Sequence, residues 1–176
     1  MRIISGKYKG FQFPQKNMPH ARPTTDRGKE ALFNILDLHY YLDEIDVLDL
    51  YSGLGSIAME FVSRGSNVIA VDSSFKSIRY IQANIQKLNC EIQLKQTAVL
   101  TFLKRCEASF DIVFADPPYN ASQEIHDLLE TITNGNFLKS GGVFILEHQT
   151  AMPIKHPSCY DSRKYGQSTF SFFKFE

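Results

Sequence analysis

Short apolar runs alternate with helical patterns along most of the chain. Five runs, rich in β-branched and other apolar residues, have the length of buried parallel strands, and they lie at residues 47–50, 68–71, 92–94, 112–115 and 143–146. Between the second and third runs, apolar residues recur at the spacing of one helix face, at Ile78, Ile81, Ile85 and Leu88. Strands that alternate with helices indicate βαβ units, so we expect an α/β fold with a doubly wound, mostly parallel sheet.

The N-terminal region has a different pattern. Residues 2–5 and 11–13 flank a turn at 6–10, which predicts a short β-hairpin. The first helix is expected to begin directly afterwards, with Thr24 or Thr25 as its N-cap and an acidic residue in its first turn.

The C-terminal region also departs from the alternation. Tyr160 and residues 169–175 flank a turn at 164–167 with no helix between them, which predicts an antiparallel hairpin on the sheet edge. We therefore expect a seven-stranded sheet that is mostly parallel. Residues 1–176 should form a single domain, in which residues 1–24 are a hairpin extension.

The composition indicates an ordinary globular domain, because 43% of residues are hydrophobic and 22% are charged. We find no secretory signal and no apolar run of membrane-spanning length, so a cytoplasmic location is expected. Neither disulfides nor a zinc site is expected, since the three cysteines are scattered without a CxxC pair, at Cys90, Cys106 and Cys159. The five histidines lack metal-ligand spacing, so no metal is predicted.

The charge is distributed unevenly although the net charge is zero. Residues 1–30 contain seven Lys or Arg and two acidic residues, so this segment carries +5 and the remainder −5. Such asymmetry is typical of a segment that faces a polyanion, and equally of a solvated basic tail. Any contact with nucleic acid would therefore be confined to part of the surface, since the chain as a whole has no net charge.

A glycine-rich loop follows the first strand, in the sequence Asp49-Leu50-Tyr51-Ser52-Gly53-Leu54-Gly55. Gly53 and Gly55 lack Cβ atoms, so the backbone can turn tightly and lie against a ligand. Asp49 is expected to orient the loop or to hold a cationic amino-acid group. Asp72, which ends the second strand, would accept hydrogen bonds from the ribose hydroxyls of an adenosine, or cap the next helix. The same glycines also fit a dinucleotide-binding loop, which keeps an NAD-dependent dehydrogenase open.

A more specific motif, Asp116-Pro117-Pro118-Tyr119, follows the fourth strand. Two prolines end the strand and give a rigid loop. Asp116 and the Pro117 carbonyl can accept both hydrogens of an exocyclic base amine and aim its lone pair at a sulfonium methyl group. Tyr119 offers an aromatic face on which an extruded base can stack. These features predict an amino methyltransferase that uses S-adenosylmethionine, whereas a dehydrogenase has no use for the motif.

The chain resembles the bacterial RsmD family of 16S rRNA guanine-N2 methyltransferases over nearly its whole length. The resemblance is carried by residues 2–10, 22–27, 30–36, 49–55, 63–65, 116–119 and 163–166. The sequence departs from the family pattern at Asp72, where glutamate is more common, and at Tyr51 and Ser52, which replace Phe and Ala. Thr97 stands where many methyltransferases carry an aspartate for the adenine amine, so we expect that contact from the backbone near Ala98 and Val99.

The resemblance implies a Rossmann-like class I methyltransferase that acts on one guanine N2 amine of 16S rRNA. It implies S-adenosylhomocysteine as product and a monomer whose substrate is an assembled or partly assembled 30S subunit. The residues expected to bind the cofactor are Asp49, Tyr51, Ser52, Gly53, Gly55, Asp72, Ser73, Ala98, Val99 and Thr24. Asp116, Pro117 and Tyr119 are the expected catalytic residues, and Arg22, Arg27 and Tyr119 the expected substrate contacts.

Several alternatives stay open at this stage. The Asp-Pro-Pro-Tyr motif fits an adenine-N6 methyltransferase on DNA or RNA equally well, so the choice of guanine depends on the family resemblance. A catalytically idle RNA-binding or assembly factor would also retain the fold. Lys29 is expected to contact RNA phosphates, to order a lid over the cofactor, or to lie on a solvated helix face. Arg64 and Arg163 are expected to form structural ion pairs.

Overall fold

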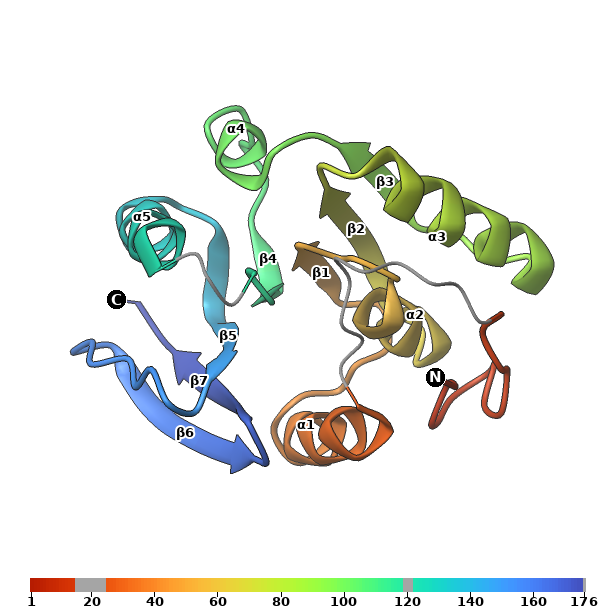
Figure 1. Ribbon diagram of the computed structural model, residues 1–176, viewed down its shortest axis with the longest axis horizontal. Coiled ribbons are helices and arrows are strands. Elements are labelled where there is room, and N and C mark those ends of the chain that lie inside the picture. Colours follow the sequence, from red (N-terminus) through yellow and green to blue (C-terminus); the bar gives the residue numbers. More distant parts are fainter. Residues whose placement is uncertain (15–24, 119–121, 176) are drawn as a thin grey trace.

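Seven strands form one sheet in the order β3-β2-β1-β4-β5-β7-β6 in the computed structural model, which describes residues 1–14, 25–118 and 122–175 (Figure 1). The strands are β1 Asp46–Leu50, β2 Asn67–Asp72, β3 Gln93–Gln96, β4 Phe110–Ala115, β5 Leu138–Gln149, β6 Cys159–Tyr165 and β7 Ser168–Phe173. The first five pair in parallel, and β7 pairs antiparallel with both β5 and β6. The predicted seven-stranded, mostly parallel sheet with a C-terminal hairpin is confirmed.

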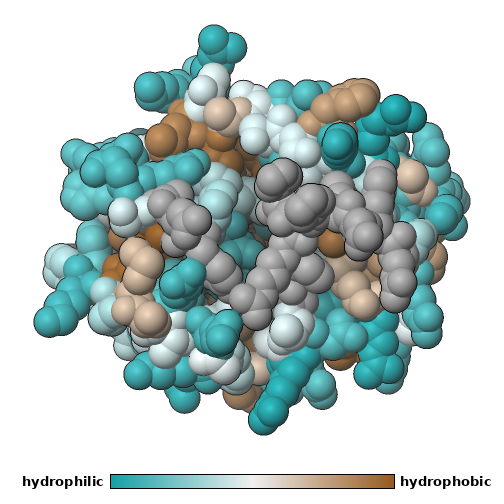
Figure 2. All heavy atoms as spheres, viewed as in Figure 1, coloured by the Kyte–Doolittle hydropathy of each residue, from teal (hydrophilic) through white to brown (hydrophobic). Residues whose placement is uncertain are grey.

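Helices cover both faces of this sheet (Figure 1). They are α1 Asp26–His39, α2 Ser56–Ser63, α3 Phe75–Leu88, α4 Val99–Leu103 and α5 Ser122–Asn134. One buried cluster joins Leu32 and Phe33 of α1 and Phe61 of α2 to one face of the sheet. A second buried cluster joins Leu103 of α4 and Leu128 of α5 to the other face. The described part of the molecular face in Figure 2 is mostly hydrophilic, with hydrophobic residues in separate patches.

Local capping explains where the first helix begins. The Oγ1 atom of Thr25 accepts a hydrogen bond from Gly28 N at 3.1 Å, and Asp26 lies in the first turn, where a negative charge favours the helix dipole. Thr25 is therefore the N-cap, which resolves the choice that the sequence left open. Thr24 lies outside the described residues.

The N-terminal hairpin is shorter than predicted. A single antiparallel bridge joins Arg2 and Gln12. The first arm bonds to α2 instead of extending a ladder, because Ile4 N donates to Glu60 Oε1 at 2.7 Å and Lys7 N donates to Ser63 O at 2.6 Å. Main-chain groups bound to a helix are not available for strand pairing.

The parallel strands bring their carboxyl ends to one edge of the sheet. After β1 the chain enters α2 on the face that α1 covers, whereas after β4 it enters α5 on the opposite face. Because β1 and β4 are hydrogen-bonded neighbours, the connections diverge between them. This point of divergence is where ligands bind in open α/β sheets.

Candidate active site

The glycine-rich loop leaves β1 through backbone conformations in the left-handed region, which glycine adopts most easily. Tyr51, Gly53 and Gly55 have positive φ angles of 59°, 51° and 73°. A Cβ atom on Gly55 would lie 2.8 Å from Cγ1 of Ile81 in α3, so a side chain there would displace the helix packed against the loop. The Tyr51 hydroxyl donates to Glu124 Oε1 of α5 at 2.8 Å, and burial together with Glu124 raises the pKa of Tyr51. The loop is thus fixed between α3 and α5.

Ser52 holds the loop against the neighbouring strand. Its side chain is buried, and its Oγ atom lies 2.9 Å from Asp49 O and 3.1 Å from Val71 O. Its main-chain N–H also donates to Val71 O at 3.0 Å. The hydroxyl and the main-chain N–H are therefore both engaged within the protein, and the cofactor contact of Ser52 stays a prediction.

Asp49 is a buried carboxyl at the start of the loop. It is 1% exposed, and its Oδ2 atom accepts a hydrogen bond from Ala58 N in the first turn of α2 at 3.2 Å. Burial, reinforced by the negative charge of Asp72, raises the pKa of Asp49 to about 8. This geometry fits the expected role in orienting the loop and helix, while contact with a cationic group stays a prediction.

The raised pKa of Asp49 gives a testable dependence of stability on pH. Between pH 4 and 8 the folded chain retains a proton that the unfolded chain releases, so the free energy of unfolding should fall as pH rises through this window. Relative to Asp49→Asn, the ligand-free protein should lose up to about 1.4 kcal/mol per pH unit. Urea denaturation at several pH values measures the difference, and parallel curves would contradict it.

Asp72 connects the glycine loop to the turn after β2. Its Oδ2 atom accepts from Gly53 N at 2.8 Å, and its Oδ1 atom accepts from Ser74 N at 2.7 Å. The N-cap of α3 is Ser74, whose side chain accepts from Ser77 N, so the alternative reading of Asp72 as the helix cap is wrong. The adjacent Ser73 is exposed. Asp72 thus lies at the sheet edge beside Gly53, as a ribose contact requires.

Residues 97–99 lie next to Asp72. Thr97 N donates to Asp72 O at 3.1 Å, and the exposed Ala98 is the N-cap residue of α4. The side chain of Val99 is 3% exposed and packs in the core beneath α4 and α5. Since that side chain is buried, a ligand contact at Val99 would come from the main chain, in line with the expected backbone contact.

Asp116 lies beside the glycine loop. Leu50 pairs with Ala115, and the hydrogen bond from Asp116 N to Leu50 O, at 3.4 Å, carries the β1–β4 pairing one residue further. Asp116 is half-buried, Pro117 is buried and Pro118 is exposed. Tyr119 lies outside the described residues, as does Arg22. The structure therefore brings the start of the predicted catalytic motif to the predicted cofactor loop.

A fourth carboxylate, Glu147, lies at this edge and was not among the predicted site residues. It is 3% exposed and follows Leu146, which pairs with Ala115 directly before Asp116. The sequence contains a signal for it, since Glu147 is the first charged residue after the apolar run at 143–146. With Asp72 and Asp116, Glu147 makes this edge acidic, which favours a cationic ligand.

The basic N-terminal region divides into exposed and buried parts. Arg2, Lys7, Lys9 and Arg27 are exposed. Lys29 is instead 0% exposed: its Nζ atom donates to Arg2 O at 2.5 Å and lies 3.2 Å from Glu60 Oε1. The expectations of an RNA contact and of a solvated helix face for Lys29 are wrong, because a fully buried ammonium can reach neither RNA nor water.

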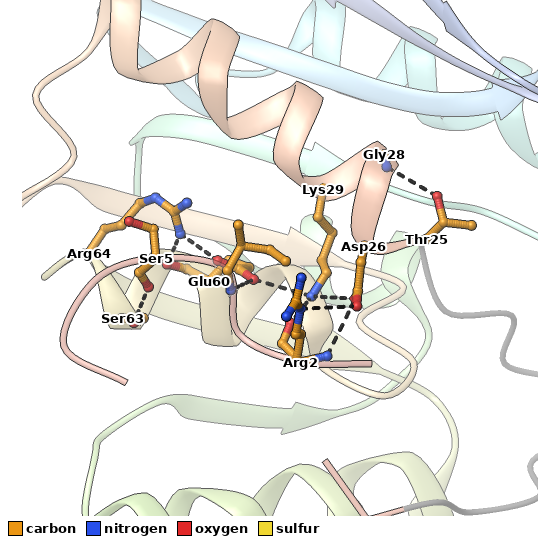
Figure 3. Close-up of polar contacts among 10 residues, drawn as sticks. Arg2, Ser5, Thr25, Asp26, Gly28, Lys29, Glu60, Ser63 and Arg64 are labelled. Atoms are coloured by element: carbon orange, nitrogen blue, oxygen red, sulfur yellow. Dashed lines mark hydrogen bonds and ion pairs between the residues drawn. The ribbon is translucent and has the colours of Figure 1, made fainter. Parts of the chain in front are cut away.

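Lys29 belongs to a polar cluster that joins the N-terminal arm, α1 and α2 (Figure 3). Glu60 is its centre: one carboxylate oxygen accepts from Lys29 and from Ile4 N, and the other lies 2.5 Å from Arg64 Nη1. The Arg64 guanidinium also stacks 4.1 Å from the ring centre of Phe33. Arg64 is thus a structural ion-pair residue, and so is Arg163, whose Nε lies 2.9 Å from Asp161 Oδ2.

Within residues 1–14, 25–118 and 122–175, no group of three or more His, Cys, Asp or Glu side chains is arranged to hold a metal ion. In the same ranges, no helix has the length and apolar character needed to cross a membrane.

Comparison with known proteins identifies close relatives. The family model described as "Conserved hypothetical protein 95" matches residues 1–174. Ribosomal RNA small subunit methyltransferase D of Haemophilus influenzae is 32% identical over 166 residues, which cover 89% of this chain and 83% of the relative. The Escherichia coli K12 protein of the same name is 31% identical over 136 residues, covering 74% and 67%. A solved protein of Thermus thermophilus, described as hypothetical, matches with a TM-score of 0.87 at 24% identity and covers 99% of both chains, which shows a shared fold.

Proposed function

The chain belongs to the Conserved hypothetical protein 95 family, and from this premise we propose that it transfers a methyl group from S-adenosylmethionine to the N2 amine of a guanine in 16S rRNA. The observation that carries the proposal is the position of Asp116, which extends the β1–β4 pairing directly beside the glycine loop. The predicted Rossmann-like class I methyltransferase fold is confirmed by the strand order and by the similar solved structures.

The residues at the carboxyl edge fit S-adenosylmethionine, a nucleoside that carries a sulfonium and an ammonium group. Asp72 can accept from ribose hydroxyls, the backbone at 98–99 can face the adenine, and the positive φ angles of Gly53 and Gly55 let the loop lie against the ligand. The neighbouring carboxylates of Asp72 and Asp116 complement two positive charges. When bound, the cofactor supplies an electrophilic methyl group.

The protein's part in the reaction is to position the amine. The Asp116 side chain and the Pro117 carbonyl would each accept one hydrogen of the amine, which favours a pyramidal nitrogen with its lone pair directed at the methyl carbon. The nitrogen would gain the methyl group as the S–C bond of the cofactor breaks, with S-adenosylhomocysteine as the other product, and would then release a proton to solvent. Because the proton leaves after transfer, catalysis needs orientation and electrostatic stabilisation more than a strong base.

The exposed basic residues of the N-terminal arm and α1 would contact RNA phosphates. Their backbone is held rigidly, since Ser63 accepts from Lys7 N and its Oγ atom accepts from Tyr8 N at 3.0 Å. The rest of the chain carries a net negative charge, so we propose a composite substrate, the assembled or partly assembled 30S subunit, bound by a cytoplasmic monomer.

Nucleoside mass spectrometry of rRNA from a deletion strain tests the proposal. Loss of one N2-methylguanosine from 16S rRNA, restored by the cloned chain, is the expected result. Loss of N6-methyladenosine instead would favour the adenine enzyme. In vitro, purified 30S subunits should be methylated faster than naked 16S rRNA. Failure to bind S-adenosylmethionine in calorimetry, with RNA affinity retained, would support the idle assembly factor.

A further inference from the structure

Glu147 is a buried carboxylate on the strand next to Asp116. Leu146 of β5 pairs with Ala115 of β4, so Glu147 and Asp116 each lie one residue beyond the same pair. Neighbouring strands are separated by about 4.8 Å, which places the two residues next to each other at the carboxyl edge of the sheet. Glu147 is only 3% exposed, and on its other side it pairs with Phe170 of β7.

The two residues also project from the same face of the sheet. Side chains alternate along a strand, and Ile145 packs in the cluster with α1 and α2 whereas Leu146 packs in the cluster with α5. Glu147 therefore lies on the α1 side. Phe114 packs in the same cluster as Ile145, and Asp116 follows it by two residues, on the same side.

Two neighbouring carboxylates match one edge of guanine. Guanine presents N1–H and the N2 amine side by side, and every N–H group on this edge is a hydrogen-bond donor. Adenine presents an unprotonated N1, an acceptor, beside its N6 amine. Asp116 and the Pro117 carbonyl would engage the amine in either base, but a second carboxylate beside Asp116 gains a hydrogen bond only from guanine and repels the adenine N1 lone pair.

Glu147 can accept N1–H without giving up its place in the fold. It already takes part in an interaction within the protein, but a carboxylate offers about four lone-pair sites, so a further donor adds to that interaction. The apolar surroundings, which include Phe170 at 0% exposure, strengthen a hydrogen bond to Glu147 and make a mismatched base costly.

We propose that Glu147 accepts a hydrogen bond from N1–H of the target guanine and thereby sets the preference for guanine over adenine. This inference rests on the proposed function, because it assumes that Asp116 receives the neighbouring amine. The Asp-Pro-Pro-Tyr motif alone leaves the choice between guanine and adenine open, and the inference assigns this choice to Glu147.

The test exchanges the base and the residue together. Reconstituted 30S subunits would carry either guanine or 2-aminopurine at the mapped target; 2-aminopurine keeps the N2 amine but has an unprotonated N1. The wild-type kcat/KM should favour guanine by about 100-fold or more, since a site built for a donor rejects a base that lacks it. In Glu147→Gln, whose amide can donate to an unprotonated N1, this ratio should fall below about tenfold.

Glu60→Gln is the matched control, because Glu60 is also a buried glutamate but lies in the structural cluster of α2. It should change both rates equally and leave the ratio at its wild-type value. Calorimetry with S-adenosylmethionine verifies that each variant is folded, and if Glu147→Gln is not, Glu147→Asp should keep the guanine preference at a reduced rate.

Four results would overturn the inference while the proposed function stands. One is equal wild-type rates on guanine and 2-aminopurine, another is a ratio unaltered by Glu147→Gln, and a third is a ratio lost in Glu147→Asp. The last is a Glu147→Gln variant that folds but methylates neither base. Glu147 would then be needed even on 2-aminopurine, which has no N1–H for it to accept. Absence of N2 methylation by the wild-type enzyme would instead refute the proposed function.

Discussion

Replacing Asp116 with alanine is expected to lower kcat of methyl transfer by about 10²- to 10³-fold, the range seen when one preorganised electrostatic partner of a reacting group is removed. The variant would lose an acceptor for the target amine, so the lone pair would no longer be aimed at the methyl carbon. The affinity for S-adenosylmethionine should stay within about twofold of the wild-type value, because the cofactor loop is held by Ser52, Asp49 and Asp72. Single-turnover transfer to 30S subunits and calorimetry measure the two quantities.

Asp111→Ala provides a control with the same change of charge on β4, the strand that Asp116 directly follows. Asp111 is near the opposite end of β4, where its Oδ2 atom lies 2.8 Å from Lys139 Nζ. Five residues of extended strand separate it from Asp116 by about 16 Å. Its kcat should therefore match that of the wild type. Unchanged turnover in Asp116→Ala would refute the proposed mechanism.

Replacing Glu60 with alanine is expected to lower the free energy of unfolding by about 3 to 5 kcal/mol, the cost of breaking a buried ion pair from one side. The variant would leave the ammonium of Lys29 inside the protein with the Arg2 carbonyl and with Asp26 at 3.6 Å as its remaining partners. It would also release Ile4 N, so the N-terminal arm should exchange its amide hydrogens faster. Urea denaturation and hydrogen exchange at pH 7 measure both effects.

A variant of Lys29, the partner of Glu60, distinguishes the energy of the ion pair from the loss of packing. Lys29→Met should cost less than Glu60→Ala, because Glu60 would keep Arg64 and Ile4 N as partners. Combining Lys29→Met with Glu60→Ala should cost less than the sum of the two, since the double variant buries no unpaired ammonium. Asp37→Ala, at an exposed position 4.0 Å from Arg64, should change stability by less than about 1 kcal/mol. Strictly additive losses would contradict a coupled buried pair.

The apolar pattern predicted well the strands that are buried on both faces of the sheet. β1, β2 and β4 are covered on both faces, so their sequences are nearly continuous apolar runs. β3 is an edge strand with the polar sequence Gln93-Leu94-Lys95-Gln96, and its predicted position, 92–94, was displaced from the observed Gln93–Gln96. β5 extends well beyond the predicted 143–146. Its first residues are partly exposed, whereas the polar residues Glu147 and His148 at its other end are buried and pair with β7.

The candidate site was predicted unevenly for a related reason. Gly53, Gly55 and Asp116 have local signatures, since a positive φ angle or a rigid strand end requires particular residue types at particular spacings. Glu147 has no conformational signature of this kind, and the sequence marks it only as the first charged residue after the apolar run at 143–146. Its place beside Asp116 follows from the pairing of β4 with β5, two strands that are separated in the chain by a whole helix.

The sequence by itself therefore determined the fold class, the glycine loop and the loop at Asp116, because each is encoded by hydrophobic period or backbone conformation within a few residues. Only the tertiary structure decided that Lys29 is a buried partner of Glu60 and that Glu147 lies next to Asp116. Both facts depend on contacts between distant segments, 31 residues apart in the first case. A charged side chain carries no local mark of whether its partner will be water or another buried charge.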